Sequence, residues 1–393
     1  MLLGYGGKNC WCFKEWMQVD LTLKEGVPAD VSMNLPASTA LCFKGANASG
    51  KTNALKVYGF ITDFARNSFS YKPESNIFFD SFFGNDEPGE FYVEFISKEN
   101  YYRYEFIVTQ KKVIKECLYR KRNIKGSRET KIFDRENNEI TKNTLYKSNS
   151  GIIFRDNASF ISTLHQYNLP EIEDIYNFFY FVSFNIGYFG LHDGSSVNPA
   201  LNPYIIASDY ANDPQMLSFV ENKIRQFDTG IEKILIKSRK DEQNNDVFYP
   251  VFIHTVESQK IEPLLYEMES SGTKALYNKL EFYYLTLKTG GVLVLDEFDI
   301  NLHTDILPHL LDLFINKENN PLNAQIIFTT HSNEIMDILG RYRTYLVQKE
   351  NGESFCYRLD ELSAELLRND RPISTPYRKH LIGGYPKIGT EEN

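Results

Sequence analysis

The sequence predicts an α/β fold with a parallel sheet flanked by helices, an antiparallel β subdomain, and an insertion of helices and strands. Three observations predict it. An apolar strand at 38–44 leads through a glycine-bearing loop into an amphipathic helix. Residues 77–122 alternate with a period of two, as antiparallel hairpins do. The final third alternates helical and strand-like segments, which is typical of a parallel sheet with crossover helices.

In the N-terminal half, residues 1–24 alternate and are rich in aromatics, which predicts one or two strands. The helix that follows the glycine-bearing loop is indicated by a stripe of apolar residues: Ala54, Val57, Tyr58, Ile61, Phe64 and Ala65. The hairpin block contains four strand-like segments: IFFDSFFG, EFYVEFIS, YYRYEFIVT and KKVIKECLYRKR. Residues 123–151 are polar, charged and rich in Asn, so we expect a mobile hairpin tip or loop there.

In the C-terminal half, residues 158–184 and 215–228 have helical spacing, and residues 231–257 have strand-like spacing. The glycines and prolines of 185–214 predict a loop. The remaining segments alternate between the two types. We expect helices at 273–288, 304–317 and 333–340, and strands at 291–296, 325–330 and 343–349.

Length and composition limit the class of protein. A chain of 393 residues allows two or three domains, or one large α/β domain with insertions. With 42% hydrophobic residues it can bury a sizeable core, and a net charge of -9 disfavours a protein that coats DNA. The five cysteines are scattered, which indicates reduced thiols. No signal peptide and no apolar run of about 20 residues is present, so we expect a cytoplasmic protein without a membrane span.

Residues 45–52, GANASGKT, fit the phosphate-loop pattern G-x-x-x-x-G-K-[ST] between a strand and a helix. Glycines let the backbone curl so that successive N–H groups point at phosphate oxygens, and the helix N-terminus adds its positive dipole end. Lys51 would reach the β- and γ-phosphates of ATP, and Thr52 would place a hydroxyl on Mg²⁺. The alternative, a chance glycine-rich turn, is disfavoured by the flanking strand and helix. The predicted nucleotide-binding residues are Gly45, Asn47, Ser49, Gly50, Lys51, Thr52 and Asn53.

An apolar run at 292–295 ends in two carboxylates, Asp296 and Glu297. Four consecutive apolar residues suit a strand that is buried on both faces, so the carboxylates would emerge at its carboxyl end. We expect Asp296 to organise Mg²⁺ beside Thr52, and Glu297 to orient or deprotonate the attacking water. The alternative is a strand that ends in a solvated acidic turn, and the presence of a phosphate loop makes it less favoured.

Two further segments complete a set of four motifs. The segment 269–273, ESSGT, opens a predicted helix, where serine hydroxyls and free N–H groups can meet a γ-phosphate. His331 follows the apolar strand IIF and can hydrogen-bond the same phosphate. The alternatives are an ordinary helix cap and a surface histidine, and each is favoured when taken singly. The order of the four motifs along the chain favours a shared nucleotide site.

These motifs resemble those of ABC-type ATPases. The chain resembles bacterial AAA/ABC-type ATPases, SMC/RecF/OLD-like and RloA-like, that serve in anti-phage defence systems such as PARIS and Septu. The resemblance implies an ABC-type ATPase head, that is, a P-loop NTPase parallel sheet with an antiparallel β subdomain, and ATP hydrolysis as the activity. The signature segment departs from the usual pattern, because Glu269 occupies the place of a leucine. The matching stretches are 8–9, 12–15, 45–52, 270–274, 295–303, 324–332 and 377–388.

The resemblance also implies roles and cofactors. With ATP and Mg²⁺ as cofactors, the catalytic residues would be Glu297, Lys51 and the switch histidine His331. The metal ligands would be Thr52 and Asp296.

In ABC-type ATPases the signature of one subunit closes over the ATP of the other. Ser270, Ser271 and Gly272 would therefore bind the partner subunit's nucleotide, and Asp299 matches the loop that crosses between subunits. The implied assembly is a homodimer formed through an ATP sandwich, or a higher homo-oligomer. The implied partners are a separate effector, a nuclease or toxin, and a phage-encoded trigger.

The predicted organisation has four parts. These are 1–120, with the phosphate loop and the hairpins; 121–260, an insertion of helices and strands; 261–350, with the signature, the acidic pair and the histidine; and a C-terminal extension, 351–393.

Three functions compete at this point. The first is a defence ATPase that controls an effector, the second is a RecF/SMC-like DNA repair ATPase that binds DNA directly, and the third is a scaffold with structural nucleotide. Residues 111–131 are basic and could contact nucleic acid, but a solvated β-ribbon is the favoured interpretation. The acidic net charge favours the first or third function.

Overall fold

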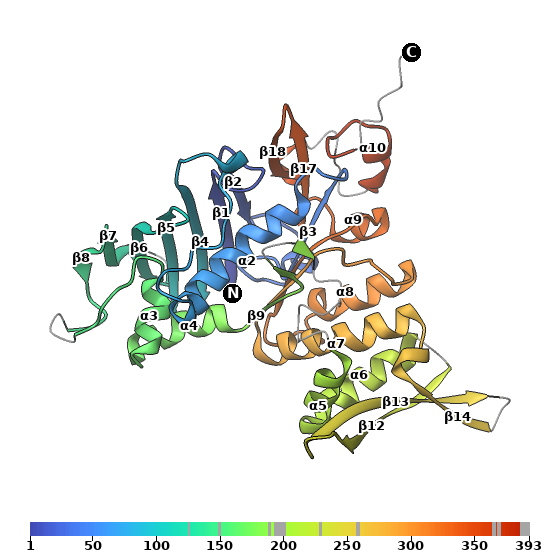
Figure 1. Ribbon diagram of the computed structural model, residues 1–393. Coiled ribbons are helices and arrows are strands. Elements are labelled where there is room, and N and C mark those ends of the chain that lie inside the picture. The colour runs from blue at the N-terminus through green and yellow to red at the C-terminus, as the bar shows by residue number, and fades with distance from the viewer. Residues whose placement is uncertain are drawn as a thin grey trace, which may run out of the picture.

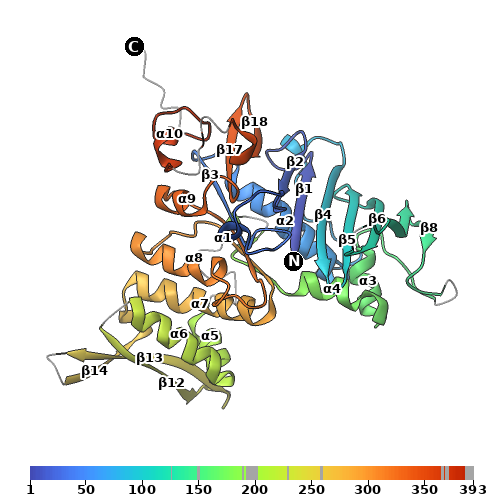
Figure 2. The same ribbon diagram turned by 180° about the vertical axis from the view of Figure 1, so that it is seen from behind.

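The computed structural model describes residues 1–124, 126–147, 151–187, 190–191, 202–227, 230–256, 260–363, 367 and 371–385. An antiparallel sheet and a mostly parallel sheet share one long helix, and further helices cover the far side of the parallel sheet (Figure 1, Figure 2). A small lobe with its own three-stranded sheet lies beyond those outer helices. The arrangement confirms the predicted α/β class with an antiparallel β subdomain and an insertion of helices and strands.

Alternating side chains build the antiparallel sheet. Phe91, Val93 and Phe95 are buried while the residues between them are half-buried, so one face of the sheet points into the core. Within the described residues the strands, in spatial order, are β2 (Met17–Asp20), β1 (Leu2–Lys8), β4 (Gly89–Ser97), β5 (Asn100–Val108), β6 (Val113–Arg122), β7 (Thr130–Glu136) and β8 (Glu139–Asn143).

Short strands build the second sheet, and three neighbouring strands in it are fully buried. Its strands run parallel except for β18, which pairs antiparallel with β17 at one edge. The predicted apolar run at 292–295 is buried on both faces, as a central strand of a parallel sheet should be. In the described residues the spatial order is β18 (Glu353–Arg358), β17 (Thr344–Glu350), β3 (Ala40–Gly45), β16 (Gln325–Thr329), β15 (Val292–Leu295) and β9 (Val182–Phe184).

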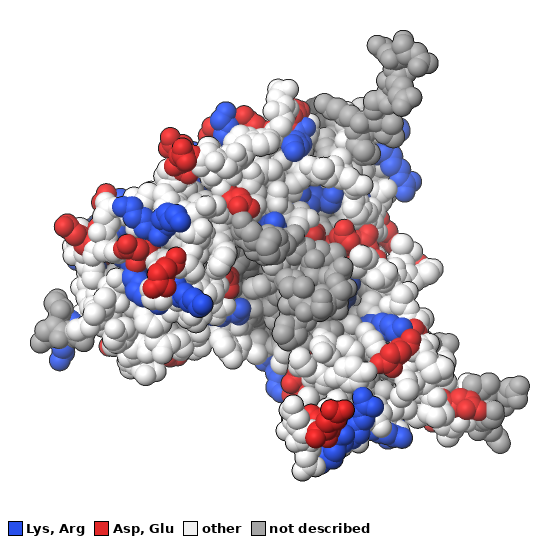
Figure 3. Space-filling model, in the orientation of Figure 1, with Lys and Arg blue, Asp and Glu red and all other residues white. Residues whose placement is uncertain are grey.

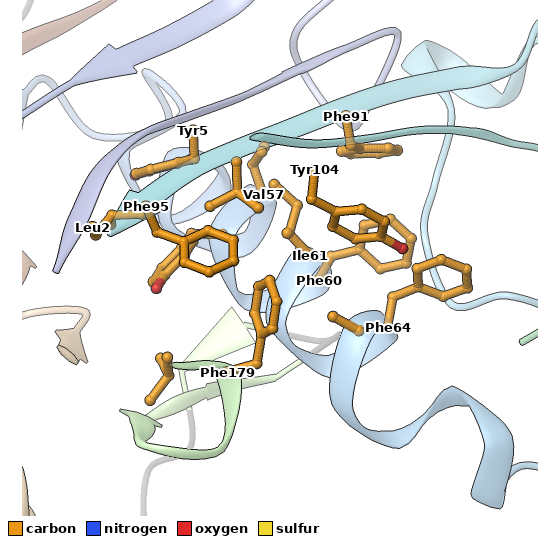
Figure 4. Packing of buried hydrophobic residues seen from close by; sticks show 14 of the residues in the cluster. Leu2, Tyr5, Val57, Phe60, Ile61, Phe64, Phe91, Phe95, Tyr104 and Phe179 are labelled. Atoms are coloured by element: carbon orange, nitrogen blue, oxygen red, sulfur yellow. The ribbon is translucent and has the colours of Figure 1, made fainter. Parts of the chain in front are cut away.

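Helix α2 (Lys51–Asn67) joins the two sheets into one core. Its predicted apolar stripe, with Val57, Ile61 and Phe64, packs on the antiparallel sheet, and the same cluster includes Val294 of the parallel sheet (Figure 4). Because sheets lie on both sides of it, the helix is buried along most of its length. α3 (Phe160–Gln166) and α4 (Glu173–Tyr180) close the end of this core.

A second core covers the other face of the parallel sheet. It consists of apolar side chains from the outer helices, from the helices and strands of the lobe, and from those residues of β3, β15 and β16 that face away from α2. The outer helices are α7 (Ser271–Thr289), α8 (Leu307–Ile315) and α9 (Asn333–Leu339). The lobe contains α5 (Pro203–Asn212), α6 (Pro214–Phe227), β12 (Ile231–Lys240), β13 (Asp246–Val256) and β14 (Lys260–Leu265).

The remaining elements are short. α1 (Ala29–Ser32) and α10 (Ser374–Arg378) lie at the periphery, whereas the pair of β10 (Ile186–Gly187) and β11 (Gly190–Leu191) contacts α2, with Ile186 in the core. Single 3-10 turns lie at Ser68–Ser70, Phe82–Gly84, Pro170–Ile172, Tyr266–Met268, Thr304–Ile306 and Leu359–Glu361. None of the helices within the described residues has the length and apolar content that crossing a bilayer requires.

The predictions for the final third, for the helix at 215–228 and for the strands in 231–257 are confirmed to within a few residues. The predicted strand at 77–84 is wrong, because this segment bonds irregularly to its neighbours and ends in a 3-10 turn. The prediction of a loop at 123–151 is wrong for β7 and β8. The residues of β8 are almost all exposed, so the strand carries no apolar alternation that could reveal it.

Two further predictions in the middle of the chain are wrong. Residues 182–184 of the predicted helix 158–184 form β9, an edge strand too short for a periodic pattern. The predicted loop 185–214 contains α5, which Asn202 caps and Pro203 begins. Proline is favoured at the first position of a helix, so the residue interpreted as a breaker was a start signal. The rest of that predicted loop, 188–189 and 192–201, lies outside the described residues.

Charges of both signs are interspersed over the face shown in Figure 3. Within the basic stretch 111–131, cations likewise bond to neighbouring polar or acidic groups. Lys131 pairs with Asp134 at 2.7 Å, and Lys112 donates to Asn137. These bonds favour the interpretation of the stretch as a solvated β-ribbon.

The lobe is attached to α7 through two carboxyl groups, which predicts a pH-dependent stability. Burial and the neighbouring Asp209 carboxyl, which hydrogen-bonds it, raise the pKa of Glu281 from 4.5 to about 8. An acid whose pKa is raised on folding keeps a proton that the unfolded chain releases, so stability falls as the pH rises from about 4.5 to about 8. Glu281→Gln removes this dependence. Denaturant unfolding should show the variant gaining roughly 1–3 kcal/mol on wild type between about pH 6 and pH 9.

The matched control is Glu318→Gln, because Glu318 is an exposed carboxylate that follows α8, away from the pair of Glu281 and Asp209. Its stability should follow that of wild type at both pH values. A constant difference between Glu281→Gln and wild type across the pH range would contradict the shared-proton interpretation.

Candidate functional site

The motifs predicted from the sequence meet at one edge of the parallel sheet. β16 lies between β3 and β15, and the three strands run in the same direction, with Thr329 opposite Phe43 and Leu295 opposite Phe328. Their carboxyl ends therefore lie side by side. The phosphate loop follows β3, the acidic pair follows β15, and His331 follows β16, which is the position where open α/β sheets bind ligands.

The phosphate loop needs its glycines. A Cβ at Gly45 would lie 2.4 Å from the carbonyl oxygen of Val347, and Gly50 has a φ of 110°, in the left-handed region. The side chain of Lys51 lies along the inside of the loop, where its Nζ donates to the carbonyls of Gly45 (3.0 Å) and Ala46 (2.9 Å). Burial lowers the pKa of Lys51, and nearby acids, with Asp296 the first of them, oppose that shift.

Asp296 lies at the centre of the site and is 3% exposed. Its two carboxylate oxygens accept hydrogen bonds from different segments: Oδ2 from the Thr52 hydroxyl at 2.7 Å, and Oδ1 from the Thr329 hydroxyl at 2.6 Å. The predicted proximity of Thr52 and Asp296 is therefore present. A hydroxyl and a carboxylate are oxygen ligands of the kind that Mg²⁺ prefers.

Asn185, which sequence reasoning missed, fixes the backbone at Asp296. Its amide nitrogen donates to the carbonyl of Asp296 at 3.0 Å, and its amide oxygen accepts from the N–H of Asp296 at 2.8 Å. The residue follows β9, which pairs parallel with β15. The one signal available was a polar residue directly after the apolar run FVSF, the same pattern that identified the acidic pair.

Glu297 turns the chain away from the sheet. It has a φ of 51°, and its N–H donates to the Thr329 hydroxyl at 2.8 Å. The left-handed region is costly for a residue with a Cβ, so this hydroxyl and the surrounding packing hold a strained turn. The half-buried carboxylate stands one residue from Asp296, beside the phosphate loop.

His331 is placed by backbone bonds. Its N–H donates to the carboxylate of Asp299 at 3.1 Å, and its carbonyl accepts from Nζ of Lys44 at 2.7 Å. Its side chain is exposed. Burial lowers the pKa of Lys44 to about 8, a shift that neighbouring acids, among them Asp299, oppose. The loops after β15 and β16 are thus joined to each other and to β3.

Lys279 is a second residue that the sequence did not reveal. It extends from α7 toward the loop that follows Glu297, with its Nζ 3.5 Å from the carbonyl of Ile300. Burial lowers its pKa to about 8, and the charges of Asp299 and Glu297 oppose that shift. Its position on α7 adds a cation to the acidic side of the site.

The signature segment lies at the start of α7. Ser270 caps the helix by accepting from the N–H of Thr273 at 3.1 Å, and Ser271 is exposed. A Cβ at Gly272 would lie 3.4 Å from the carbonyl of Asn301. These contacts stay within α7 and the loop after Glu297. Among the described residues, the signature serines form no hydrogen bond with the phosphate loop of the same chain.

The unusual Glu269 has a partner in the lobe. Its carboxylate, 8% exposed, lies 2.6 Å from Nε2 of His254 on β13. The pair connects the residue before the signature to the three-stranded sheet. Leucine, which is usual at this place, could not make this contact.

Several features of the loop fit a bound polyphosphate. The Ser49 hydroxyl is buried and has no hydrogen-bond partner among the described residues, and the Lys51 ammonium bonds only neutral carbonyls. Asn47 is exposed at the loop tip. Asn53, by contrast, donates to Sγ of Cys12 at 3.1 Å, so its side chain is engaged away from the loop.

Residues 41–337, about three quarters of the chain, match the family described as AAA domain, putative AbiEii toxin, Type IV TA system. No curated protein matches the chain.

Similar solved structures include the SMC head domain from Thermotoga maritima, with 13% identity and a TM-score of 0.42 over 91% of this chain and 98% of that one. Another is the Smc head domain with an extended coiled coil bound to the C-terminal domain of ScpA derived from Pyrococcus furiosus. That match has 10% identity and a TM-score of 0.41, over 97% of this chain and 99% of that one. On the family match, which includes both the phosphate loop and the acidic pair, the chain belongs to this family of AAA domains.

Proposed function

We propose that the chain binds ATP with Mg²⁺ at the edge formed by β3, β15 and β16 and hydrolyses the γ-phosphate. The hydrogen-bonded group of Thr52, Asp296 and Thr329 beside Lys51 carries this proposal. Lys51 would exchange its loop carbonyls for phosphate oxygens. Thr52 and Asp296 would hold Mg²⁺, which neutralises phosphate charge when bound.

Glu297 would act on the attacking water. Its backbone is fixed by the Thr329 hydroxyl, so the carboxylate has a defined position next to the loop. From there it orients the water and accepts its proton as the water oxygen bonds to the γ-phosphorus and the bond to the bridging oxygen breaks, which releases ADP and phosphate. His331, whose exposed side chain follows β16, would hydrogen-bond the same phosphate. Burial of the carboxylate is partial, so water can reach it.

The functional unit that we propose is a homodimer with two ATP molecules in its interface, or a higher homo-oligomer built from it. Ser271 is exposed at the N-terminus of a 19-residue helix, where hydroxyl and N–H groups can meet a phosphate from outside the subunit. Ser270, Ser271 and Gly272 would therefore act on the partner subunit's ATP. The bond between Glu269 and His254 would hold this segment in position.

We propose a role in anti-phage defence in the cytoplasm, in which ATP-dependent closure of the dimer controls a separate effector, a nuclease or toxin, in response to a phage-encoded trigger. This rests on the resemblance of the motifs. The alternative is a RecF/SMC-like DNA repair ATPase. The ion pairs and polar bonds along 111–131 weigh against direct DNA binding there, since paired cations release fewer counterions from phosphates. The domain division that we propose is 1–120, 121–260, 261–350 and 351–393. In it, 1–120 and 261–350 are the two halves of one ATPase domain.

Glu297→Gln should bind ATP but hydrolyse it about 10²–10⁴-fold more slowly. The amide can hydrogen-bond the water but cannot take its proton. The ATP-loaded dimer should therefore accumulate, which phosphate release and size-exclusion chromatography with ATP and Mg²⁺ measure. As the control, Lys51→Ala should lose ATP binding and stay unassembled. Wild-type turnover and assembly in Glu297→Gln would assign the proton acceptor to another residue.

A mixture of two inactive variants should recover activity if the signature acts between subunits. In a mixed dimer of Lys51→Ala and Ser271→Arg, one ATP site carries both defects and the other carries none. Each variant alone has no intact site. Partial ATPase activity after verified subunit exchange is the expected result. Absence of recovery after exchange would indicate that Ser271 acts within its own chain or only caps α7.

A further inference from the structure

The outer face of the antiparallel sheet, opposite α2, carries a groove of about 680 Å³. Side chains from β2, β4, β5 and β6 line it, together with Trp16 from the segment before β2. It shares no residue with the proposed ATP site, so its function can be considered independently of ATP hydrolysis. We refer to it as the outer-face groove.

Gly4 forms part of the floor of the outer-face groove. In the sheet register, Gly4 of β1 lies between Asp20 of β2 and Glu94 of β4. Because Gly4 has no side chain, the two carboxylates stand on either side of bare backbone, with Cα atoms roughly 10 Å apart at two strand spacings. In the next row the ring of Tyr92 lies over Gly6, where a Cβ would be 2.4 Å from Cε1 of the ring.

The lining is acidic overall. Its charged residues are the carboxylates Asp20, Glu90, Glu94 and Glu105 and the cations Arg103 and Lys115.

Of the two lining cations, Arg103 lies opposite Glu94 in the register but is bonded to other carboxylates, and Lys115 lies opposite Glu136. Arg103 bridges Glu105 and Glu129, with its guanidinium 4.4 Å from the ring centroid of Tyr119. Lys8 pairs with Glu90 at 3.2 Å. Glu90 and Glu105 are therefore paired, and Asp20 and Glu94, on either side of Gly4, are the lining carboxylates outside these ion pairs.

Neutral groups donate the hydrogen bonds that the carboxylates of Asp20 and Glu94 accept from the described residues. Thr22 donates twice to one oxygen of Asp20, and the Tyr101 hydroxyl bonds Glu94. Arg358 bonds the backbone oxygen of Asp20, but its side chain pairs with Asp360 at 2.6 Å. Among the described residues, neither carboxylate forms a salt bridge within 4.0 Å.

An aromatic pair forms the wall beside these carboxylates. Trp16 is 41% exposed, and its ring centroid lies 5.7 Å from that of Tyr92, with the two planes inclined at 56°. After burial, the negative charges of Glu94 and Asp20 are the next causes that raise the pKa of Tyr92, which places both carboxylates close to its ring. Aromatic surface at Tyr92, beside two carboxylates and continued by Trp16, is a favourable site for a cation.

We propose that the outer-face groove binds an arginine side chain of a partner protein between Asp20 and Glu94, with the guanidinium against the aromatic pair of Tyr92 and Trp16. A guanidinium matches this site because it is planar, stays charged, donates from both edges at once and stacks on aromatic faces. An ammonium is a compact point charge and cannot span the two carboxylates in the same way. The acidic lining and the aromatic wall together favour an arginine-bearing peptide segment over a nucleic acid, which the carboxylates repel.

The test uses the full chain without nucleotide and a fluorescent pentapeptide with a central arginine flanked by glycines. Anisotropy should show saturable binding with a Kd of about 1 mM or tighter. The same peptide with citrulline, which has the arginine shape without the charge, should bind at least about tenfold more weakly. A lysine peptide should fall between them. Equal binding of the arginine and citrulline peptides would overturn the proposal.

Variants then locate the site. Asp20→Asn with Glu94→Gln should weaken arginine-peptide binding by about tenfold or more. The control, Glu318→Gln with Glu350→Gln, removes the same charge elsewhere and should bind like wild type. Trp16→Leu tests the stacking wall and should also weaken binding. Circular dichroism and ATPase activity confirm that each variant folds. Unchanged affinity in folded groove variants, or no saturable binding to wild type, would overturn the proposal.

Discussion

A buried carboxylate determines how the rest of this protein is arranged. Asp296 is taken out of water, and such a charge is costly unless its oxygens are hydrogen-bonded. One oxygen is bonded by Thr52 and the other by Thr329, while Asn185 bonds the backbone on both sides. The three partners come from three different segments: Thr52 opens α2, Thr329 ends β16, and Asn185 follows β9. The strand order β3, β16, β15, β9 is the order that brings these segments to one carboxylate.

The same site balances positive charge against negative. Lys44, Lys51 and Lys279 all have a pKa lowered by burial, and in each case the acids of the site oppose the shift. A buried lysine destabilises the fold unless a nearby negative charge compensates for the loss of its hydration. A bound polyphosphate would add negative charge near all three and favour their protonated forms. An anion would therefore bind with part of the free energy that was lost when these lysines were buried in the free protein.

The sequence reveals those parts of the site that depend on local pattern. The phosphate loop and the acidic pair each occupy a few consecutive residues at the end of an apolar strand, so composition and spacing predicted that Thr52 and Asp296 meet. Lys279 and the pair formed by Glu269 and His254 depend on which helix face or strand packs against a distant loop. Side-chain periodicity contains no information about such pairings. For the same reason β9, three residues long, could not be distinguished from the helix before it.

Helix α7 and the loop after Glu297 lie side by side, and this has a mechanical consequence. The helix runs from Ser271 to Thr289, about 28 Å at 1.5 Å per residue, and passes through two glycines into β15. The loop returns along it, past Lys279 and as far as Gly272. An α-helix resists both stretching and bending, so a force on the signature end is passed with little loss to the strand that carries Asp296. If Ser271 meets a partner subunit as proposed, a strain applied there would reach the strand that carries Asp296.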